Sequence, residues 1–255
     1  MTDAVLETRG LSKKFLGFTA VDEVDLSVQR GHIHALIGPN GAGKTTLFNL
    51  LTRFVEPSAG EIRFDGRPVT GLPPRQLARL GMVRSFQISA VFTGLSVLDN
   101  VRFALQRKLG VSLRFWRSIR VLDELNEQAL AILDQVGLAD LADKAAGALP
   151  YGRKRALELA TTLAMDPLLM LLDEPTQGMG YEDVDRVTAL IKKVSAGRTV
   201  LMVEHNMKVV ASIADTLSVL QRGRLLATGS YQEVSHNKEV TRAYLGGGQQ
   251  RGGLV

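Results

Sequence analysis

The segment Gly38–Thr45 constrains the fold of this chain more than any other feature of its sequence. Its residues, Gly-Pro-Asn-Gly-Ala-Gly-Lys-Thr, match the pattern G-x4-G-K-[ST]. The apolar run His32–Ile37 precedes the pattern and is typical of a buried strand. An apolar stripe at helical spacing follows the pattern and is closed by Pro57: Leu47, Leu50, Leu51 and Phe54. The order of elements is therefore predicted to be a strand, a glycine-rich loop and a helix.

Glycine-rich loops between a strand and a helix bind phosphate groups. Their backbone N–H groups point into a concave nest, and the N-terminus of the helix adds partial positive charge. The ammonium group of Lys44 is expected to hold the β- and γ-phosphates of a nucleotide, and the hydroxyl of Thr45 is expected to bind Mg²⁺. The predicted nucleotide-binding residues of the loop are Gly38, Pro39, Asn40, Gly41, Ala42, Gly43, Lys44, Thr45 and Thr46.

A second buried strand ends in two carboxylates. No apolar run in the sequence is longer than Leu168–Leu172, and Asp173 and Glu174 follow it. Ligands of open α/β sheets bind at the carboxyl ends of the strands, where these two side chains are expected to lie. Asp173 is predicted to reach Mg²⁺ directly or through water, and Glu174 to orient and help deprotonate an attacking water. The two motifs together predict hydrolysis of ATP, with ATP and Mg²⁺ bound.

The remaining pattern predicts an α/β fold with a parallel sheet, an antiparallel β portion near the N-terminus and an inserted helical subdomain. Short β-rich pieces, Val5–Thr8 and Val24–Val28, precede the loop, and Glu61–Val69 is expected to form a hairpin that turns at Asp65-Gly66. Strands and helices alternate after Pro167. We expect a single domain, 1–255, with a nucleotide-binding core at 1–87 and 166–229, a helical subdomain at 88–165, and a C-terminal helix and flexible tail at 230–255.

Composition excludes some classes of protein. The chain of 255 residues contains no cysteine, so it has neither a disulfide framework nor a cysteine-based metal site. Its longest apolar run is far shorter than the roughly 20 residues that cross a bilayer, so it is not expected to span a membrane alone. A net charge of +5 is compatible with nucleic acid, anionic lipid or phosphate ligands, and is also common on solvated surfaces.

Taken together, these motifs resemble the P-loop NTPase core of ABC ATPase subunits, and the resemblance covers nearly the whole chain. It implies roles for three further side chains. Gln87 matches the glutamine that senses Mg²⁺ and connects the site to membrane subunits, and His205 matches the switch histidine that contacts the γ-phosphate. Phe15 matches the aromatic residue that stacks on adenine, with Phe18 as the alternative. On this reading Glu174 and His205 are the catalytic residues, and Thr45, Gln87 and Asp173 are the metal ligands.

The family's signature loop, usually Leu-Ser-Gly-Gly-Gln, is represented by a divergent segment: Leu149, Pro150, Tyr151, Gly152 and Arg153. In the family this loop contacts ATP held by the opposite subunit, which implies a closed dimer with a second copy or a paralogue. Pro150 has neither a hydroxyl nor an N–H group, so contact with phosphate must depend on the Gly152 amide, the helix dipole and Arg153. A second departure is Gly180, where many relatives have an aspartate.

The Pro-Tyr-Gly signature and the segment Ala243–Gly246 are similar to the group that takes up branched-chain and other hydrophobic amino acids. The resemblance implies an importer ATPase at the cytoplasmic face of the inner membrane, peripheral to it, with membrane-spanning permease subunits as partners and a substrate-binding protein as an indirect one. A lipid or polysaccharide exporter ATPase and a non-transport ABC protein acting on ribosomes or DNA are the alternatives.

A basic cluster with interleaved aromatic residues lies within a long insert: Arg114, Phe115, Trp116, Arg117 and Arg120. Such a cluster is suited to nucleic acid, to lipid headgroups or to a cytoplasmic loop of a membrane subunit. A solvated helix with a tryptophan anchor is the structural alternative. Among the functional options we favour the membrane subunit or the membrane surface, and no nucleic acid partner is expected.

Overall fold

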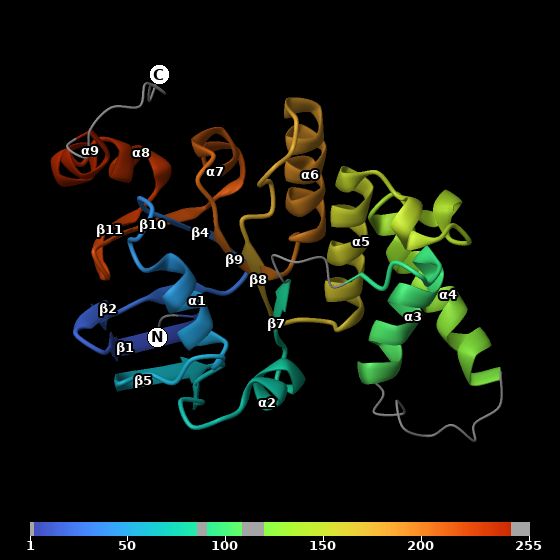
Figure 1. Cartoon of the computed structure of the whole chain (residues 1–255), viewed down its shortest axis with the longest axis horizontal. Helices are drawn as coiled ribbons and strands as arrows, with labels where there is room; N and C mark the ends of the chain where they lie inside the picture. The colour runs from blue at the N-terminus through green and yellow to red at the C-terminus, as the bar shows by residue number, and fades with distance from the viewer. Residues whose placement is uncertain (1–2, 86–90, 109–119, 246–255) are drawn as a thin grey trace.

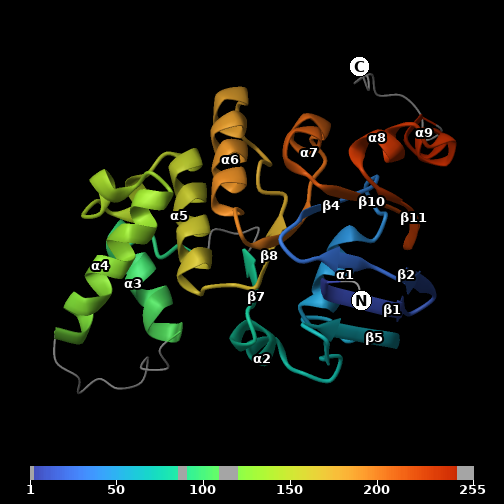
Figure 2. The ribbon, with the colours of Figure 1, turned by 180° about the vertical axis from the view of Figure 1, so that it is seen from behind.

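A six-stranded sheet with helices on both sides forms the centre of the structure, a computed structural model that describes residues 3–85, 91–108 and 120–245 (Figure 1). The helices α5, α6 and α7 form a row along one side of this sheet, and α1 and a smaller antiparallel sheet lie on the other side (Figures 1 and 2). The helices α3 and α4 pack beyond α5 at one end of the molecule. The predicted α/β class is confirmed.

The six-stranded sheet has the order β11-β10-β4-β9-β8-β7. Pairing is parallel from β10 to β7, and β11 pairs with β10 in antiparallel orientation. All residues of β4, β8 and β9 are buried, as their continuous apolar sequences predict for strands covered on both faces. The strands are β4 (Ile33–Ile37), β7 (Met82–Ser85), β8 (Leu169–Asp173), β9 (Thr199–Val203), β10 (Thr216–Gln221) and β11 (Arg224–Gly229).

The smaller sheet is built from the N-terminal part of the chain. Its order is β2-β1-β5-β6, and β3 also pairs with β1. The predicted hairpin is confirmed, because β5 and β6 pair across Asp65 and Gly66, whose φ angles of 48° and 73° suit a type I′ turn. The strands are β1 (Ala4–Phe15), β2 (Phe18–Val24), β3 (Ser27–Gln29), β5 (Ala59–Phe64) and β6 (Arg67–Pro68).

A single strand over Val24–Val28 is wrong, because β2 ends at Val24 and β3 begins at Ser27. The side chain of Thr8 interrupts the backbone ladder between them. Its hydroxyl donates to Val24 O at 2.8 Å and accepts from the N–H group of Leu26 at 2.9 Å. A side chain that takes the place of a backbone partner bends the chain at this point.

The helices of the core and of the helical block follow the predicted order. A buried stripe runs along α4 at Leu125, Ala129 and Leu133 and continues to Val136, and Gly137 follows it with a φ of 68°. The helices are α1 (Lys44–Leu51), α2 (Pro74–Arg79), α3 (Val97–Lys108), α4 (Arg120–Gln135), α5 (Tyr151–Ala164), α6 (Tyr181–Val194), α7 (Met207–Ile213), α8 (Tyr231–Ser235) and α9 (Lys238–Leu245), with 3-10 turns at Ala139–Leu141 and Ala146–Ala148.

Two helix boundaries differ from the prediction. The helix after the glycine-rich loop ends at Leu51, because Arg53 adopts a φ of 60°, and Phe54 is therefore exposed instead of continuing the buried stripe. At the C-terminal end Ser230 and Glu233 form a capping box, but the helix that it starts has only five residues. A second helix, α9, begins after Asn237, whose side chain accepts from the N–H of Glu239 at 2.8 Å.

The strand β11 was not predicted. Most of its residues are only partly buried, so its sequence shows neither a continuous apolar run nor an alternating pattern. The hairpin that joins β10 to β11 turns at Arg222 and Gly223, which both adopt positive φ angles. The glycine at this turn was the available signal in the sequence. Within the described ranges, no helix combines the length and apolar character needed to cross a bilayer. The predicted tail and the basic aromatic stretch Arg114–Arg117 lie outside the described residues.

The buried histidine of β4 makes the stability of this fold sensitive to acid. His34 is fully buried, and its Nε2 lies 2.8 Å from Ser218 Oγ on β10. Its Nδ1 has no hydrogen-bond partner among the described residues. Burial, with a smaller contribution from His32, lowers the pKa of His34 from 6.5 to about 4. A protonated ring would bring an unsatisfied donor and a charge into the core.

We expect unfolding measurements to show this effect between pH 7.5 and pH 5. Because the pKa of His34 is lower in the folded than in the unfolded protein, its stabilising effect is complete above pH 6.5 and is lost as the pH falls toward 4. By pH 5 the free energy of unfolding should have fallen by about 2 kcal/mol because of this group. Urea unfolding of His34→Gln should lack this part of the pH dependence, and the exposed His32→Gln should retain it. Identical pH dependence in all three proteins would contradict the assignment.

Candidate active site

The glycine-rich loop joins β4 to α1 and packs closely against neighbouring backbone. A Cβ atom at Gly38 would lie 2.2 Å from the carbonyl oxygen of Leu220, and one at Gly43 would lie 2.4 Å from that of Ala20. Gly43 also adopts a φ of 104°, which residues with side chains rarely adopt. Two of the three glycines of the motif are therefore required by close approach of the backbone to β2 and β10.

The loop lines a cavity of about 310 Å³. Glu174 lies on the same cavity, so the structure brings the end of β8 to the glycine-rich loop. Phe18 and Ala20 of β2 also line it, whereas Phe15 does not. The loop residues at this cavity are Asn40, Gly41, Ala42, Gly43, Lys44, Thr45 and Thr46.

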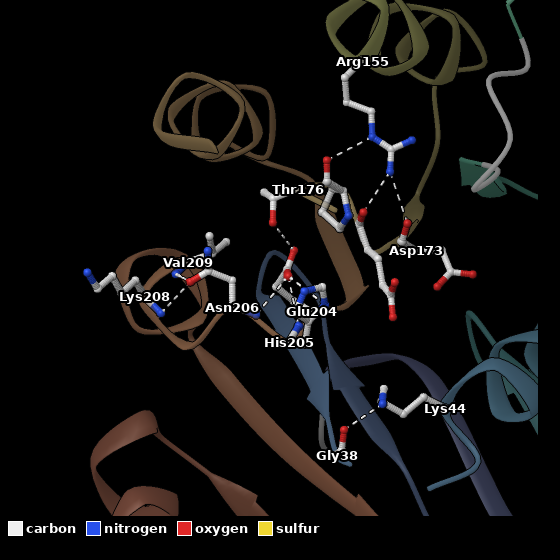
Figure 3. A network of polar contacts seen from close by, with 12 residues as sticks. Gly38, Lys44, Arg155, Asp173, Thr176, Glu204, His205, Asn206, Lys208 and Val209 are labelled. Atoms are coloured by element: carbon white, nitrogen blue, oxygen red, sulfur yellow. Dashed lines mark hydrogen bonds and ion pairs between the residues drawn. The ribbon is translucent and has the colours of Figure 1, made fainter. Parts of the chain in front are cut away.

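Lys44 lies at the base of this loop and is largely buried. Its Nζ donates to the carbonyl oxygen of Gly38 at 2.7 Å (Figure 3) and to that of Pro39 at 3.1 Å. Burial lowers the pKa of Lys44, and the nearby carboxylates of Glu174 and Asp173 act in the opposite direction. Gly38 and Pro39 therefore contact the lysine instead of lining the cavity. The arrangement places Lys44 and the carboxylate of Glu174 at one cavity, with the buried Asp173 nearby.

The two carboxylates at the end of β8 differ in their surroundings. Asp173 is buried, and its Oδ2 accepts from Arg84 Nη2 at 2.6 Å. Arg84 also donates to Asn49 of α1 at 2.6 Å, so it connects β7, β8 and α1. Glu174 is partly exposed, adopts a φ of 46°, and lies on the cavity. Glu174 is thus available to a ligand, whereas Asp173 is held in the core.

Oxygen donors at the cavity and next to it fit Mg²⁺. Thr45 offers a hydroxyl at the cavity, and the buried Asp173, which directly precedes Glu174, has a carboxylate. Mg²⁺ binds oxygen ligands, commonly one or two carboxylates together with water and substrate phosphate. Across the part of the chain that the structure describes, no group of three or more His, Asp or Glu side chains could hold a metal without such additional ligands. Gln87, the third predicted ligand, lies outside the described residues.

His205 lies on the turn between β9 and α7, and more than half of its side chain is exposed. The buried carboxylate of Glu204 holds this turn, since it accepts from the backbone N–H groups of His205 at 2.9 Å and Asn206 at 3.1 Å. It also accepts from the hydroxyl of Thr176 at 2.8 Å (Figure 3). His205 does not line the cavity described above, although its turn is bonded to the segment that follows Glu174.

The two candidate adenine-stacking residues lie opposite each other in the hairpin of β1 and β2. Phe18 reaches the cavity of the glycine-rich loop. Phe15 instead lies beneath the ammonium of Lys13, 5.2 Å from its ring centroid. The geometry therefore favours Phe18 over Phe15 as a neighbour of a nucleotide base.

The signature segment lies away from this cavity, at the N-terminus of α5. Pro150, Gly152 and Arg153 line a separate cavity of about 550 Å³ between α4, α5 and α6. Leu149 is buried, and the exposed Tyr151 donates to the carbonyl oxygen of Gln177 at 3.2 Å. The chain does not bring its own signature segment to its own glycine-rich loop.

Four residues that form hydrogen bonds with the site residues or with their backbone were not identified from the sequence: Arg84, Arg155, Thr176 and Glu204. The basic run Arg153-Lys154-Arg155 suggests a solvated surface, yet Arg155 is buried. The spacing of Arg155 and Glu158, which forms an ion pair on one face of α5, was the available signal. Glu204 directly precedes the candidate histidine, and a carboxylate at the end of an apolar strand was a comparable signal.

Comparisons with known proteins agree with this geometry. The family model for the ABC transporter matches residues 21–177, and that for the branched-chain amino acid ATP-binding cassette transporter matches residues 224–249. The high-affinity branched-chain amino acid transport ATP-binding protein BraF of Pseudomonas aeruginosa is 40% identical, with 96% of this chain and 99% of the relative covered. The corresponding protein LivG of Escherichia coli is 36% identical, with 96% and 99% covered.

Solved structures with a similar fold are ATP-binding cassettes of ABC transporters. One in its ADP conformation has a TM-score of 0.84 and 30% identity, with 95% of this chain and 99% of that chain covered. A nucleotide-free cassette has a TM-score of 0.82 and 28% identity, with 94% and 98% covered. With the glycine-rich loop, the carboxylates at the end of β8 and these relatives in agreement, the chain belongs to the ABC transporter family and is one of its ATP-hydrolysing subunits.

Proposed function

We propose that this chain hydrolyses ATP to power uptake of branched-chain or other hydrophobic amino acids, or related small amides, through separate membrane subunits. The observation that supports this cargo is the similarity to branched-chain amino acid transport ATP-binding proteins over nearly the full length, together with the C-terminal match at residues 224–249. That match covers β11, α8 and α9, which lie outside the match to the general ABC transporter model. We place the chain at the cytoplasmic face of the inner membrane, peripheral to it.

We propose the following roles for the site residues. The loop amides and Lys44 bind the phosphates, Phe18 or Phe15 contacts the adenine, and Glu174 orients and deprotonates the attacking water. His205 contacts the γ-phosphate. Thr45, Asp173 and Gln87 would hold Mg²⁺, which would neutralise charge on the phosphates. Arg84 holds the Asp173 carboxylate in place at 2.6 Å.

A second copy of the chain, or a paralogue, completes the site. The signature segment Leu149–Arg153 lies outside the chain's own nucleotide cavity, and its Gly152 amide is at the N-terminus of the 14-residue helix α5. Such a helix end favours an anionic ligand. We propose that each copy presents this segment to the nucleotide of the other. Pro150 is accommodated as the N-cap residue of α5, where it leaves the helix intact.

Membrane-spanning subunits are proposed to dock where α2, β7, α3 and α5 meet. Two cavities of about 230 and 250 Å³ lie here and share Val83, Arg84 and Met165. The exposed rings of Phe54, Phe92 and Phe103 line one or the other cavity, and exposed aromatic groups are typical of docking surfaces. This surface lies on the strand that leads to Gln87 and on the proposed helical subdomain, 88–165. A substrate-binding protein would act through the membrane subunits.

Transport assays test the cargo directly. Deletion of the gene is expected to abolish high-affinity uptake of radiolabelled leucine, and the wild-type chain should restore it. Lys44→Ala should not restore it, which would connect uptake to ATP hydrolysis. Uptake of a cationic amino acid serves as the control and should not change. Normal leucine uptake in the deletion strain would contradict the proposed cargo while leaving the ATPase activity of the purified chain intact.

A further inference from the structure

A series of buried hydrogen bonds connects α5 to the turn of His205, and it passes through the backbone that follows β8 (Figure 3). Its side chains are those of Arg155, Thr176 and Glu204, and all three are buried. None of them lines the cavity of the glycine-rich loop. They can therefore influence hydrolysis only through the residues that they hold.

Arg155 holds the backbone on both sides of Glu174. Its Nη2 donates to the carbonyl oxygens of Asp173 at 3.2 Å and Glu174 at 3.1 Å, and its Nε donates to that of Pro175 at 3.0 Å. The remaining donor, Nη1, pairs with Glu158. Only the planar fork of an arginine can satisfy three consecutive carbonyl groups and a carboxylate together. The bonds fix a segment in which Glu174 adopts a left-handed φ of 46°.

Glu204 holds the other end of the same segment. Its three hydrogen-bond partners are all donors: the hydroxyl of Thr176 and the backbone N–H groups of His205 and Asn206. This donor set suits an ionised carboxylate, which only accepts. The ring Nδ1 of His205 lies 3.7 Å from Oε1 of Glu204, and in the described part of the chain no arginine or lysine forms an ion pair with it. A histidine is cationic only when protonated, so this buried carboxylate has no permanently charged partner, and stability alone does not account for its position.

We propose that Arg155, Thr176 and Glu204 are positioning residues, which hold Glu174 and His205 in a fixed relation to each other and to the signature helix α5. The proposal rests on the roles given above to Glu174 and His205. Because the three residues contact the backbone around the catalytic groups and not the nucleotide cavity, they act on the hydrolysis step. Their replacement should lower kcat and leave nucleotide affinity nearly unchanged.

Thr176→Val tests the centre of this series, since valine keeps the shape of threonine and removes only the hydroxyl. We expect kcat of the purified protein to fall about tenfold, as for the loss of one buried hydrogen bond to a charged group. The Kd of a fluorescent methylanthraniloyl-ATP, measured in EDTA to prevent hydrolysis, should stay within about twofold of that of the wild type. Unchanged kcat, or a loss of affinity as large as the loss of kcat, would overturn the proposal.

Glu204 offers a rescue test that a purely structural role would not pass. In Glu204→Gln the amide oxygen can accept from both N–H groups, and the amide nitrogen can donate to the Thr176 hydroxyl. Glu204→Gln is therefore expected to keep kcat within about threefold of the wild type, and Glu204→Ala to lose about tenfold or more. Thermal melting identifies variants that fail to fold. Equal kcat in a folded Glu204→Ala and the wild type would contradict a positioning role.

Arg155→Lys tests the link to α5, because a single ammonium cannot reach all the acceptors. The kcat of Arg155→Lys should fall about tenfold. In the double variant with Thr176→Val, the fold decrease in kcat should be smaller than the product of the two single decreases, as expected for residues that act as one connected unit. Arg198→Lys is the matched control, since Arg198 donates to Val194 O in α6 away from the site. Fully multiplicative effects would overturn the proposed series. No hydrolysis by the wild-type protein would instead contradict the proposed function.

Discussion

Glu174→Gln is expected to lower kcat for ATP hydrolysis by about a hundredfold or more while the protein still binds ATP. Glu174 lies on the nucleotide cavity at the end of β8, where a carboxylate can take a proton from water and an amide cannot. The change keeps the size of the side chain and its backbone contacts with Val203 and Arg155. Phosphate release from purified protein in saturating ATP and Mg²⁺ measures the loss.

The same variant should accumulate as a dimer with ATP, because binding closes two copies and hydrolysis no longer reopens them. Size-exclusion chromatography with ATP and Mg²⁺ should show a species of twice the 27.7 kDa chain mass, and the ADP-bound protein should remain monomeric. Glu239→Gln, an exposed glutamate in the first turn of α9, is the control and should keep normal turnover. A Glu174→Gln protein that stays monomeric with ATP would argue against the closed dimer.

The strands of the central sheet could be predicted because the patterns that indicate them lie within short segments of the sequence. The strands β4 and β8 are continuous apolar runs, and the residues that follow each run belong to recognisable motifs. Parallel strands place their carboxyl ends at one edge, so the glycine-rich loop and Glu174 were expected to meet, and the loop residues from Asn40 onward line one cavity with Glu174. The sequence also contained the turn at Asp65-Gly66 and the capping box at Ser230, since both depend on adjacent residues.

Features that depend on side-chain direction or on distant partners could not be predicted in this way. Phe15 and Phe18 pair across a hairpin, and only the register of β1 and β2 decides that Phe18 reaches the cavity. Arg155 ends a basic run that suggests solvent, and its acceptors belong to a different element of the chain. The break between β2 and β3 depends on the hydroxyl of Thr8, some 16 residues away from Val24. Periodicity in one segment contains none of this information.

Lys44→Ala is expected to lower kcat/KM for ATP hydrolysis by about a thousandfold, mainly because a preorganised cation at the phosphates is lost. In this structure Nζ is held at the loop by Gly38 O and Pro39 O. Alanine leaves the three glycines and the course of the loop in place, and the protein should still fold.

Two measurements separate loss of binding from loss of chemistry in Lys44→Ala. Affinity for methylanthraniloyl-ATP should fall about tenfold or more, as expected for lost charge-assisted hydrogen bonds, whereas Thr176→Val should retain it. Lys208→Ala, an exposed lysine in the first turn of α7, should match the wild type in both assays. Because Lys44 is also close to Glu174, the alanine variant leaves this carboxylate at the nucleotide cavity without its nearby cation, whereas Asp173 keeps its ion pair with Arg84. Repulsion between Glu174 and the phosphates should therefore make weak residual binding of nucleotide more dependent on Mg²⁺ than in the wild type, and equal dependence would contradict this account of the site.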